Sequence, residues 1–181
     1  MNMAKIATIM VAATISFAGT AGAQTTPPPP VPPAPKVRAM PYLETAGTSD
    51  VFEITSSQIA LMKSQNPEIR RYATQLINHH TATTNTALAA AKAAGVTPPP
   101  PVLEAQFRAM ISELLAASPA NFDRIYLSQQ VPSHQGALEL VTAYAEGGDT
   151  PQLRQAAAAA APFVRDHLAE AQRMQVSLPR R

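Results

Sequence analysis

The sequence contains no cysteine and no tryptophan, and it has few charged and few aromatic residues. Without cysteine, the chain can form neither a disulfide nor a thiolate metal site. Only 14% of the 181 residues are charged and 5% are aromatic, with a formal net charge of +2. Because no basic run is interleaved with aromatic residues, the composition predicts no nucleic-acid partner. The fold must therefore be stabilised by packing, with a bound metal ion as the remaining aid.

Long apolar runs are also missing, and the one short run lies at the N-terminus. Residues 1–23 have the pattern of a secretory signal: Lys5 first, a short apolar stretch from Ile6 to Phe17, and the small residues Ala21-Gly22-Ala23 at the cleavage site. The apolar stretch is too short for a typical membrane span, although a signal anchor is the alternative. The pattern predicts a secreted or periplasmic protein with no transmembrane span in the mature chain.

A proline-rich linker is expected to separate the signal from the folded domain. Residues 24–40 include the run PPPPVPPAP at 27–35, which favours an extended polyproline conformation over a helix. Residues 41–178 then form a single helical bundle domain, because about 140 residues suit one hydrophobic core.

The domain has helical signals throughout and no alternating strand pattern. Gly95 and Gly147-Gly148 are typical helix stops, and Pro132 and Pro162 lie inside helices that they are expected to kink. We expect helices from Thr48, Ser49 or Asp50 to about Gln65, from Pro67 to about Ala94, from Leu103 to about Ala117, from Pro119 to about Glu146 and from Pro151 to about Gln175. The predicted fold class is all-α: a four-helix bundle with an extra short helix in the long connection between the second and third main helices.

Three of the four histidines occupy core positions on three different predicted helices. His80, His134 and His167 each lie in a row of mostly apolar residues spaced three and four apart. They lie about 13, 15 and 16 residues from the starts of their helices, which agrees within about one turn. Three imidazoles could therefore meet in one layer, and imidazole is the commonest side-chain metal ligand. His79 lies off this row, and we expect it at the surface.

Glu53 on the first predicted helix could add a carboxylate to the three histidines, although it is nearer the start of its helix. Such a ligand set suits a divalent transition metal, namely Zn, Cu, Fe or Ni. The sequence has no Glu-x-x-His pair, which excludes the usual di-iron pattern of ferritin-like oxidases. Gln130 and Tyr126, on the two turns before His134, are candidates for hydrogen-bonding groups that support the metal ligands from outside. The alternative is a metal-free polar layer in which the imidazoles form hydrogen bonds and fix the helix register.

Six segments, taken in order, resemble a known family of bacterial exported proteins. The similarity is to the family called domain of unknown function 4142, over about residues 40–175. The matching segments are Ser49–Ile54, Ser56–Ala60, Tyr72–His80, Phe122–Tyr126, His134–Leu138 and Pro162–Leu168. The resemblance implies a ferritin-like four-helix bundle, no established activity, and an association with the outer membrane. It also implies that His80, His134 and His167 are the family's inward histidines, whereas His79 stands where relatives commonly carry Asp.

No catalytic motif accompanies the histidines. Ser133 and His134, for example, are adjacent on one helix and point in different directions. The first hypothesis is therefore a non-enzymatic protein of the cell envelope, either stress-related or an interaction module for an envelope protein partner, with a buried histidine layer. The second is a metal-binding protein that uses His80, His134 and His167, with Glu53 as a fourth candidate ligand. A hydrolase or an oxidase has little support from the residues.

Overall fold

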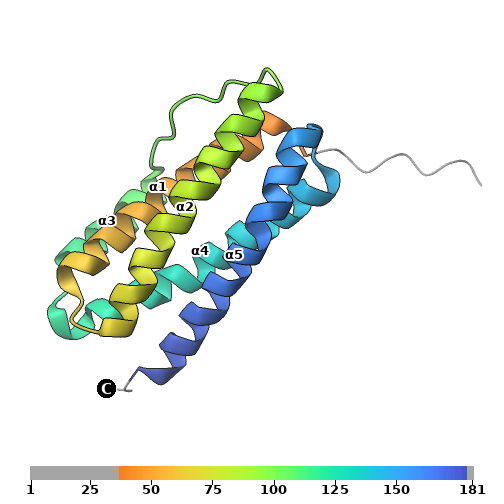
Figure 1. The fold of residues 1–181 in the computed structure, drawn as a ribbon. Coiled ribbons are helices and arrows are strands. Elements are labelled where there is room, and N and C mark those ends of the chain that lie inside the picture. Colours follow the sequence, from red (N-terminus) through yellow and green to blue (C-terminus); the bar gives the residue numbers. More distant parts are fainter. Residues whose placement is uncertain (1–36, 179–181) are drawn as a thin grey trace, which may run out of the picture. The chain divides into compact units, whose positions relative to one another are not determined.

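Five α-helices make up the structure, a computed structural model that describes residues 37–178 (Figure 1). They are α1 (Ala39–Lys63), α2 (Pro67–Ala93), α3 (Ala105–Ala116), α4 (Pro119–Gly147) and α5 (Pro151–Ser177). Within the described range the only strand-like pairing is an isolated bridge between Val37 and Gly148, so the all-α prediction is confirmed. The predicted signal and most of the predicted linker lie outside the described residues. None of the five helices combines the length and the apolar character that a membrane crossing requires.

The four long helices form a bundle in which α1 packs on α2 and α4, and α5 packs on α2 and α4. Two contacts show that α1 and α4 run antiparallel. At one end, the Val37 amide donates to the Gly147 carbonyl at 3.2 Å. At the other end, the Lys63 ammonium lies 5.9 Å from the centre of the Phe122 ring. Since α2 is also antiparallel to α1, α2 and α4 run in the same direction, and the chain must cross the length of the bundle between them (Figure 1).

The short helix α3 lies within this crossing, as predicted, and packs on α1 and α4. The connector before it approaches α1 closely. The Thr48 hydroxyl donates to the Val102 carbonyl at 3.3 Å, and a Cβ at Gly47 would lie 3.3 Å from Cβ of Pro101. The connector is thus held against the bundle by its own contacts with α1 as well as by the packing of α3.

Helix α1 begins at Ala39, and the predicted start at Thr48, Ser49 or Asp50 is wrong. Pro41 lies in the first turn, where its missing N–H has no helical partner to lose, so it does not stop the helix. The three cap candidates are interior residues of α1 instead. Because α1 begins at Ala39, Glu53 lies about 14 residues from the start of its helix, at the same depth as the three histidines.

The other predicted helices are confirmed to within a few residues. The Asn66 side chain accepts a hydrogen bond from the Glu68 amide at 2.9 Å at the start of α2, and Gly95, with φ of 70°, ends it. Helices α4 and α5 continue through Pro132 and Pro162, which both occupy exposed positions. Solvent can therefore reach the carbonyl groups that lose their helical donor.

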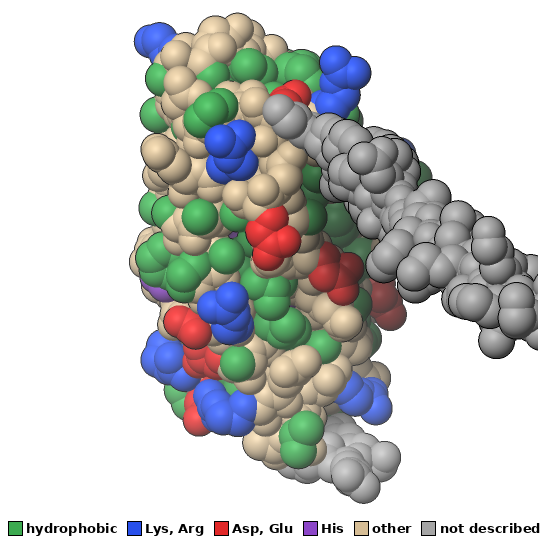
Figure 2. Space-filling model, turned by 90° about the vertical axis from the view of Figure 1, so that its right-hand side faces the viewer, with side chains coloured by type: hydrophobic (Ala, Val, Ile, Leu, Met, Phe, Trp, Pro, Cys, Tyr) green, Lys and Arg blue, Asp and Glu red, His purple; other side chains and the backbone are tan. Residues whose placement is uncertain are grey.

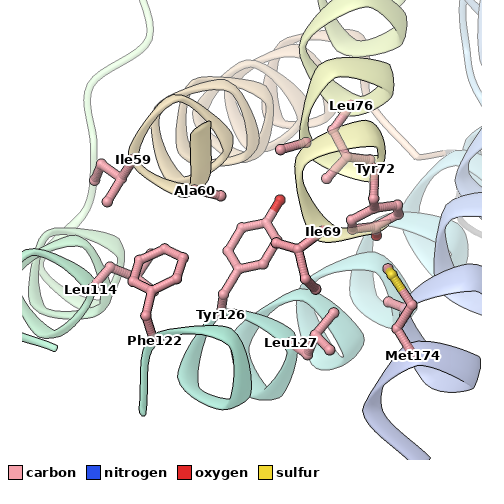
Figure 3. Packing of buried hydrophobic residues seen from close by; sticks show 12 residues of the cluster. Ile59, Ala60, Ile69, Tyr72, Leu76, Leu114, Phe122, Tyr126, Leu127 and Met174 are labelled. Carbon is pink, nitrogen blue, oxygen red and sulfur yellow. The ribbon is translucent and has the colours of Figure 1, made fainter. Parts of the chain in front are cut away.

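Two hydrophobic clusters fill the bundle, one toward each end. The first contains the T-shaped pair Tyr72 and Tyr126, with ring centroids 6.4 Å apart. Its members come from all five helices, and Figure 3 labels most of them: Ile59, Ala60, Ile69, Tyr72, Leu76, Leu114, Phe122, Tyr126, Leu127 and Met174. The second surrounds the stacked rings of Tyr42 and Tyr144, 3.9 Å apart. Buried polar residues lie between the clusters, and they form the candidate site.

Candidate metal centre

Three imidazoles from three helices meet in this polar layer: His80 of α2, His134 of α4 and His167 of α5. One ligand atom of each lies within 4.8 Å of the other two, and the ring centroids are 5.3 to 5.6 Å apart. Their exposed fractions are 4%, 0% and 1%, and the face of the molecule in Figure 2 shows hardly any histidine surface. The predicted convergence of the three core histidines is confirmed.

His80 and His134 are oriented by groups that can only accept hydrogen bonds. Nδ1 of His80 lies 2.8 Å from Oδ1 of Asp50, and Nδ1 of His134 lies 3.0 Å from the Gln130 carbonyl oxygen. Both Nδ1 atoms therefore carry hydrogen, so Nε2 is the nitrogen of each ring that is left to bind an ion. Such outer acceptors are the usual support of metal-binding histidines.

The two Nε2 atoms are 3.5 Å apart. Two nitrogens at this separation, each about 2.0–2.1 Å from a shared ion, subtend an angle of about 117° at the ion. The angle is close to that of three-coordinate, trigonal geometry. In that geometry the third nitrogen lies about 3.6 Å from the other two, so the separations to His167, which are within 4.8 Å, must shorten by up to about 1.2 Å to complete the set.

His167 is held by the fourth histidine. Its Nε2 lies 2.9 Å from Nδ1 of His79, and its own Nδ1 is buried without a hydrogen-bond partner among residues 37–178. When Nε2 of His167 donates to His79, the free lone pair of His167 is on Nδ1. As in the other two rings, one nitrogen then makes a hydrogen bond outside the set and the other is left to bind an ion, although the two nitrogens have exchanged roles. The Tyr72 hydroxyl donates to the His167 backbone carbonyl at 3.1 Å and fixes the register of α5 against α2.

His79 is therefore not the surface residue that the sequence predicted. It is half-buried, with its ring stacked on His167 at 5.1 Å and tilted against Phe163 at 4.8 Å. The physical reason is that α2 packs on both α1 and α5. A position about 100° from the row of His80 still faces a neighbouring helix in a bundle.

Glu53 lies in the same layer, at the edge of the histidine group. It is 1% exposed, and its Oε1 is 3.8 Å from Nδ1 of His134. Neither carboxylate oxygen has a hydrogen-bond partner within residues 37–178. Burial raises the pKa of Glu53 to about 7, and the charge of His80 opposes only part of this effect. A buried carboxylate without a partner is costly, so this group marks a place where positive charge would stabilise the protein.

The three core histidines differ in protonation. Burial, together with the neighbouring imidazoles, lowers the pKa of His134 to about 3 and that of His167 to about 2. Burial also lowers the pKa of His80, but the hydrogen bond and charge of Asp50 outweigh it and leave the pKa above its ordinary value. Two of the rings are thus neutral, the form that binds a metal, and His80 is the ring that holds a proton when no ion is bound.

Of the outer groups, the sequence identified Gln130 and missed Asp50. Gln130 acts through its backbone carbonyl, while its side chain donates to Ser56 at 3.1 Å. Tyr126 does not reach the histidines, because its hydroxyl is hydrogen-bonded to Ser57 at 2.9 Å. The sequence makes Asp50 a candidate helix cap, but in the structure its carboxylate accepts hydrogen bonds from His80 and from Thr84. The signal that could have found it is its spacing of three residues from Glu53 on one helix face.

Solved structures with the same fold include copper-bound and silver-bound proteins. CopM in the Cu(II)-bound form aligns with a TM-score of 0.67 and 16% sequence identity, covering 78% of this chain and 98% of that chain. CopM in the Cu(I)-bound form aligns with a TM-score of 0.64 and 15% identity, covering 77% and 96%. A DUF305 fragment from Deinococcus radiodurans aligns with a TM-score of 0.68 and 16% identity, covering 83% and 100%. At these identities the likeness shows the fold alone.

No curated protein is similar enough in sequence to count as a match. The profile of one protein family does match, over residues 24–174, which is most of the chain. The resemblance noted in the sequence is therefore confirmed, and the chain belongs to the family described as Domain of unknown function (DUF4142).

Proposed function

We propose that this protein binds a transition metal ion in the cell envelope through His80, His134 and His167, with Glu53 supplying negative charge beside the ion. The observation that carries the proposal is the convergence of three buried imidazoles. In each ring, one nitrogen is hydrogen-bonded to a residue outside this set of three. The secretory pattern of residues 1–23 supports a secreted or periplasmic location.

The polar layer is better suited to an ion than to hydrogen bonds alone. A purely structural layer satisfies its buried polar atoms. Here both oxygens of Glu53 and Nδ1 of His167 are buried and unpartnered within the described residues. A cation between the rings would bind their free lone pairs and offset the charge of Glu53.

Copper is the metal that we favour among the four candidates. Imidazole suits copper and zinc alike, but structural zinc is almost always four-coordinate and would require Glu53 to move toward the ion. A three-coordinate copper ion needs only the three histidines and not that movement of Glu53. The bound Cu(II), Cu(I) and Ag in structures of the similarly folded CopM support the same choice.

Metal titration of the purified mature chain tests the proposal. We expect one equivalent of copper to bind, with a rise in melting temperature that corresponds to about 2.7 kcal/mol when the free ion is at 100 times its Kd. The triple variant His80→Ala, His134→Ala, His167→Ala should show no shift, and His134→Gln, which keeps a polar side chain in the layer, should fold and lose most of the affinity.

Equal shifts in the wild type and the triple variant would contradict the proposal, as would a wild type that binds none of Cu, Zn, Fe and Ni. In that case the metal-free polar layer remains as the explanation. Each single alanine replacement would then destabilise the protein without any effect of added metal.

A further inference from the structure

The three core histidines are buried, so an ion needs a path to them. The exposed fractions of at most 4% leave no direct contact with solvent. His79 is the histidine outside the core set, and it is half-buried. A route that passes His79 would reach His167 first, because Nδ1 of His79 and Nε2 of His167 are 2.9 Å apart.

A surface groove between α2 and α5 leads to His79. Its volume is about 110 Å³, and its walls are mainly small side chains and one aromatic ring: Ala82, Thr86, Ala159 and Phe163. Phe163 is 43% exposed and packs against the His79 ring, so a rotation of its side chain would widen the groove. His79 is the only side chain with a metal-binding nitrogen in this groove.

On the inner side, a second cavity of about 50 Å³ touches His80 and Asp50. The groove and the cavity share Thr83, Ala156 and Ala160 in their walls. The surface groove and the space beside His80 therefore adjoin one another at these three small side chains.

We propose that His79 is the entry ligand of the metal centre: it takes an ion from the groove between α2 and α5 and passes it to His167. This inference rests on the proposed metal binding. The ion binds the lone pair on Nδ1 of His79 and so displaces the hydrogen bond from Nε2–H of His167, which keeps its proton. The ion then passes from His79 to the free lone pair on Nδ1 of His167, which brings it to Nε2 of His80 and His134, and Nε2–H of His167 donates to His79 again.

The rate of loading tests the inference separately from affinity. Tyr72 lies with its ring centroid 6.4 Å from those of His134 and His167, and the chain has no tryptophan, so quenching of tyrosine fluorescence by Cu²⁺ reports arrival at the centre. Stopped-flow mixing of the apo protein with Cu²⁺ gives the loading rate. Mixing the loaded protein with a chelator gives the release rate.

Two variants block the route in different ways. Ala159→Phe fills the groove and leaves every histidine in place, with Ala158→Phe at an exposed position of the same helix as the matched control. We expect Ala159→Phe to slow loading and release by the same factor, about tenfold or more, with the Kd unchanged. His79→Gln keeps an acceptor for His167 but should slow loading by a similar factor.

Loading of both variants at the wild-type rate would overturn the inference while leaving the proposed metal site intact. Loss of the bound equivalent in His79→Gln would also overturn it, because His79 would then be a permanent ligand. A wild type that binds no copper would instead refute the metal site itself.

Discussion

Replacing Glu53 by Gln removes a buried charge and should make the metal-free protein more stable. Glu53 is 1% exposed and lies between two hydrophobic clusters, with no hydrogen-bond partner for its carboxylate among residues 37–178. Gln keeps the size and polarity of the protonated acid but cannot ionise. The comparison therefore isolates the cost of holding a carboxylate in the layer without an ion.

The size of the effect follows from the pKa. Burial raises the pKa of Glu53 from 4.5 to about 7. Between these values the unfolded chain has released its proton and the folded chain has not, so this group lowers stability as the pH rises. The contribution of Glu53 thus lowers the free energy of unfolding progressively from about pH 4.5 to about pH 7, and above pH 7 this contribution stays constant. Glu53→Gln should thus be more stable than the wild type by about 1 kcal/mol at pH 5 and about 3 kcal/mol at pH 8.

Urea unfolding of both proteins in the presence of a chelator measures this difference. His134 and His167, whose pKa values burial lowers to about 3 and 2, have the opposite effect. Their unfolded forms take up protons below about pH 6.5, so both proteins lose stability as the pH falls, and subtraction removes the common term. Glu44→Gln, which changes an exposed carboxylate of the same helix, is the matched control.

A difference between Glu53→Gln and the wild type that does not change from pH 5 to pH 8 would refute the reasoning. It would mean that the carboxylate is already compensated in the metal-free protein. Adding one equivalent of copper should narrow or reverse the difference, because only the wild type gains an attraction between Glu53 and the ion.

Three further outcomes are expected. Asp50→Asn should lower the copper affinity about 10- to 100-fold without changing the stoichiometry, since Asp50 only orients His80; an unchanged Kd in a chelator competition would contradict this role. Copper binding should strengthen from pH 6 to pH 8 and release protons from His80 and Glu53, whose pKa values are both raised; calorimetry in buffers of different ionisation enthalpy counts these protons, and pH-independent binding without release would disagree. Tyr126→Phe removes the buried 2.9 Å hydrogen bond to Ser57 and should cost about 1–3 kcal/mol in urea unfolding with the copper affinity retained, whereas a weakened affinity would place Tyr126 in the site.

The sequence predicted the helices and the register of the histidines well, because both depend on local patterns. Proline in first turns, glycine after last turns and apolar spacings of three and four residues define α2 to α5. The start of α1 was missed because Thr48, Ser49 and Asp50 have the composition of a cap. Whether such residues cap a helix or face a neighbouring helix is decided by tertiary packing, which a local pattern does not contain.

The same limit explains two of the errors in the site, those at Asp50 and His79. Asp50 binds His80 across the α1–α2 contact, 30 residues away in sequence. His79 faces α5 because the crossover places α5, and not solvent, beside that side of α2. The depth of Glu53 was misjudged only because the start of its helix was misplaced. The core histidines were found correctly since each lies on an apolar row that must face inward.

X-ray absorption spectroscopy of the copper-loaded mature chain tests the central claim most directly. The account predicts one ion per chain with about three nitrogen ligands at about 2.0 Å and the outer-shell scattering of imidazole rings. These signals should be absent from the variant that lacks His80, His134 and His167. Coordination by oxygen or sulfur without imidazole scattering, or the same spectrum from the variant, would contradict a metal centre built on the three buried histidines.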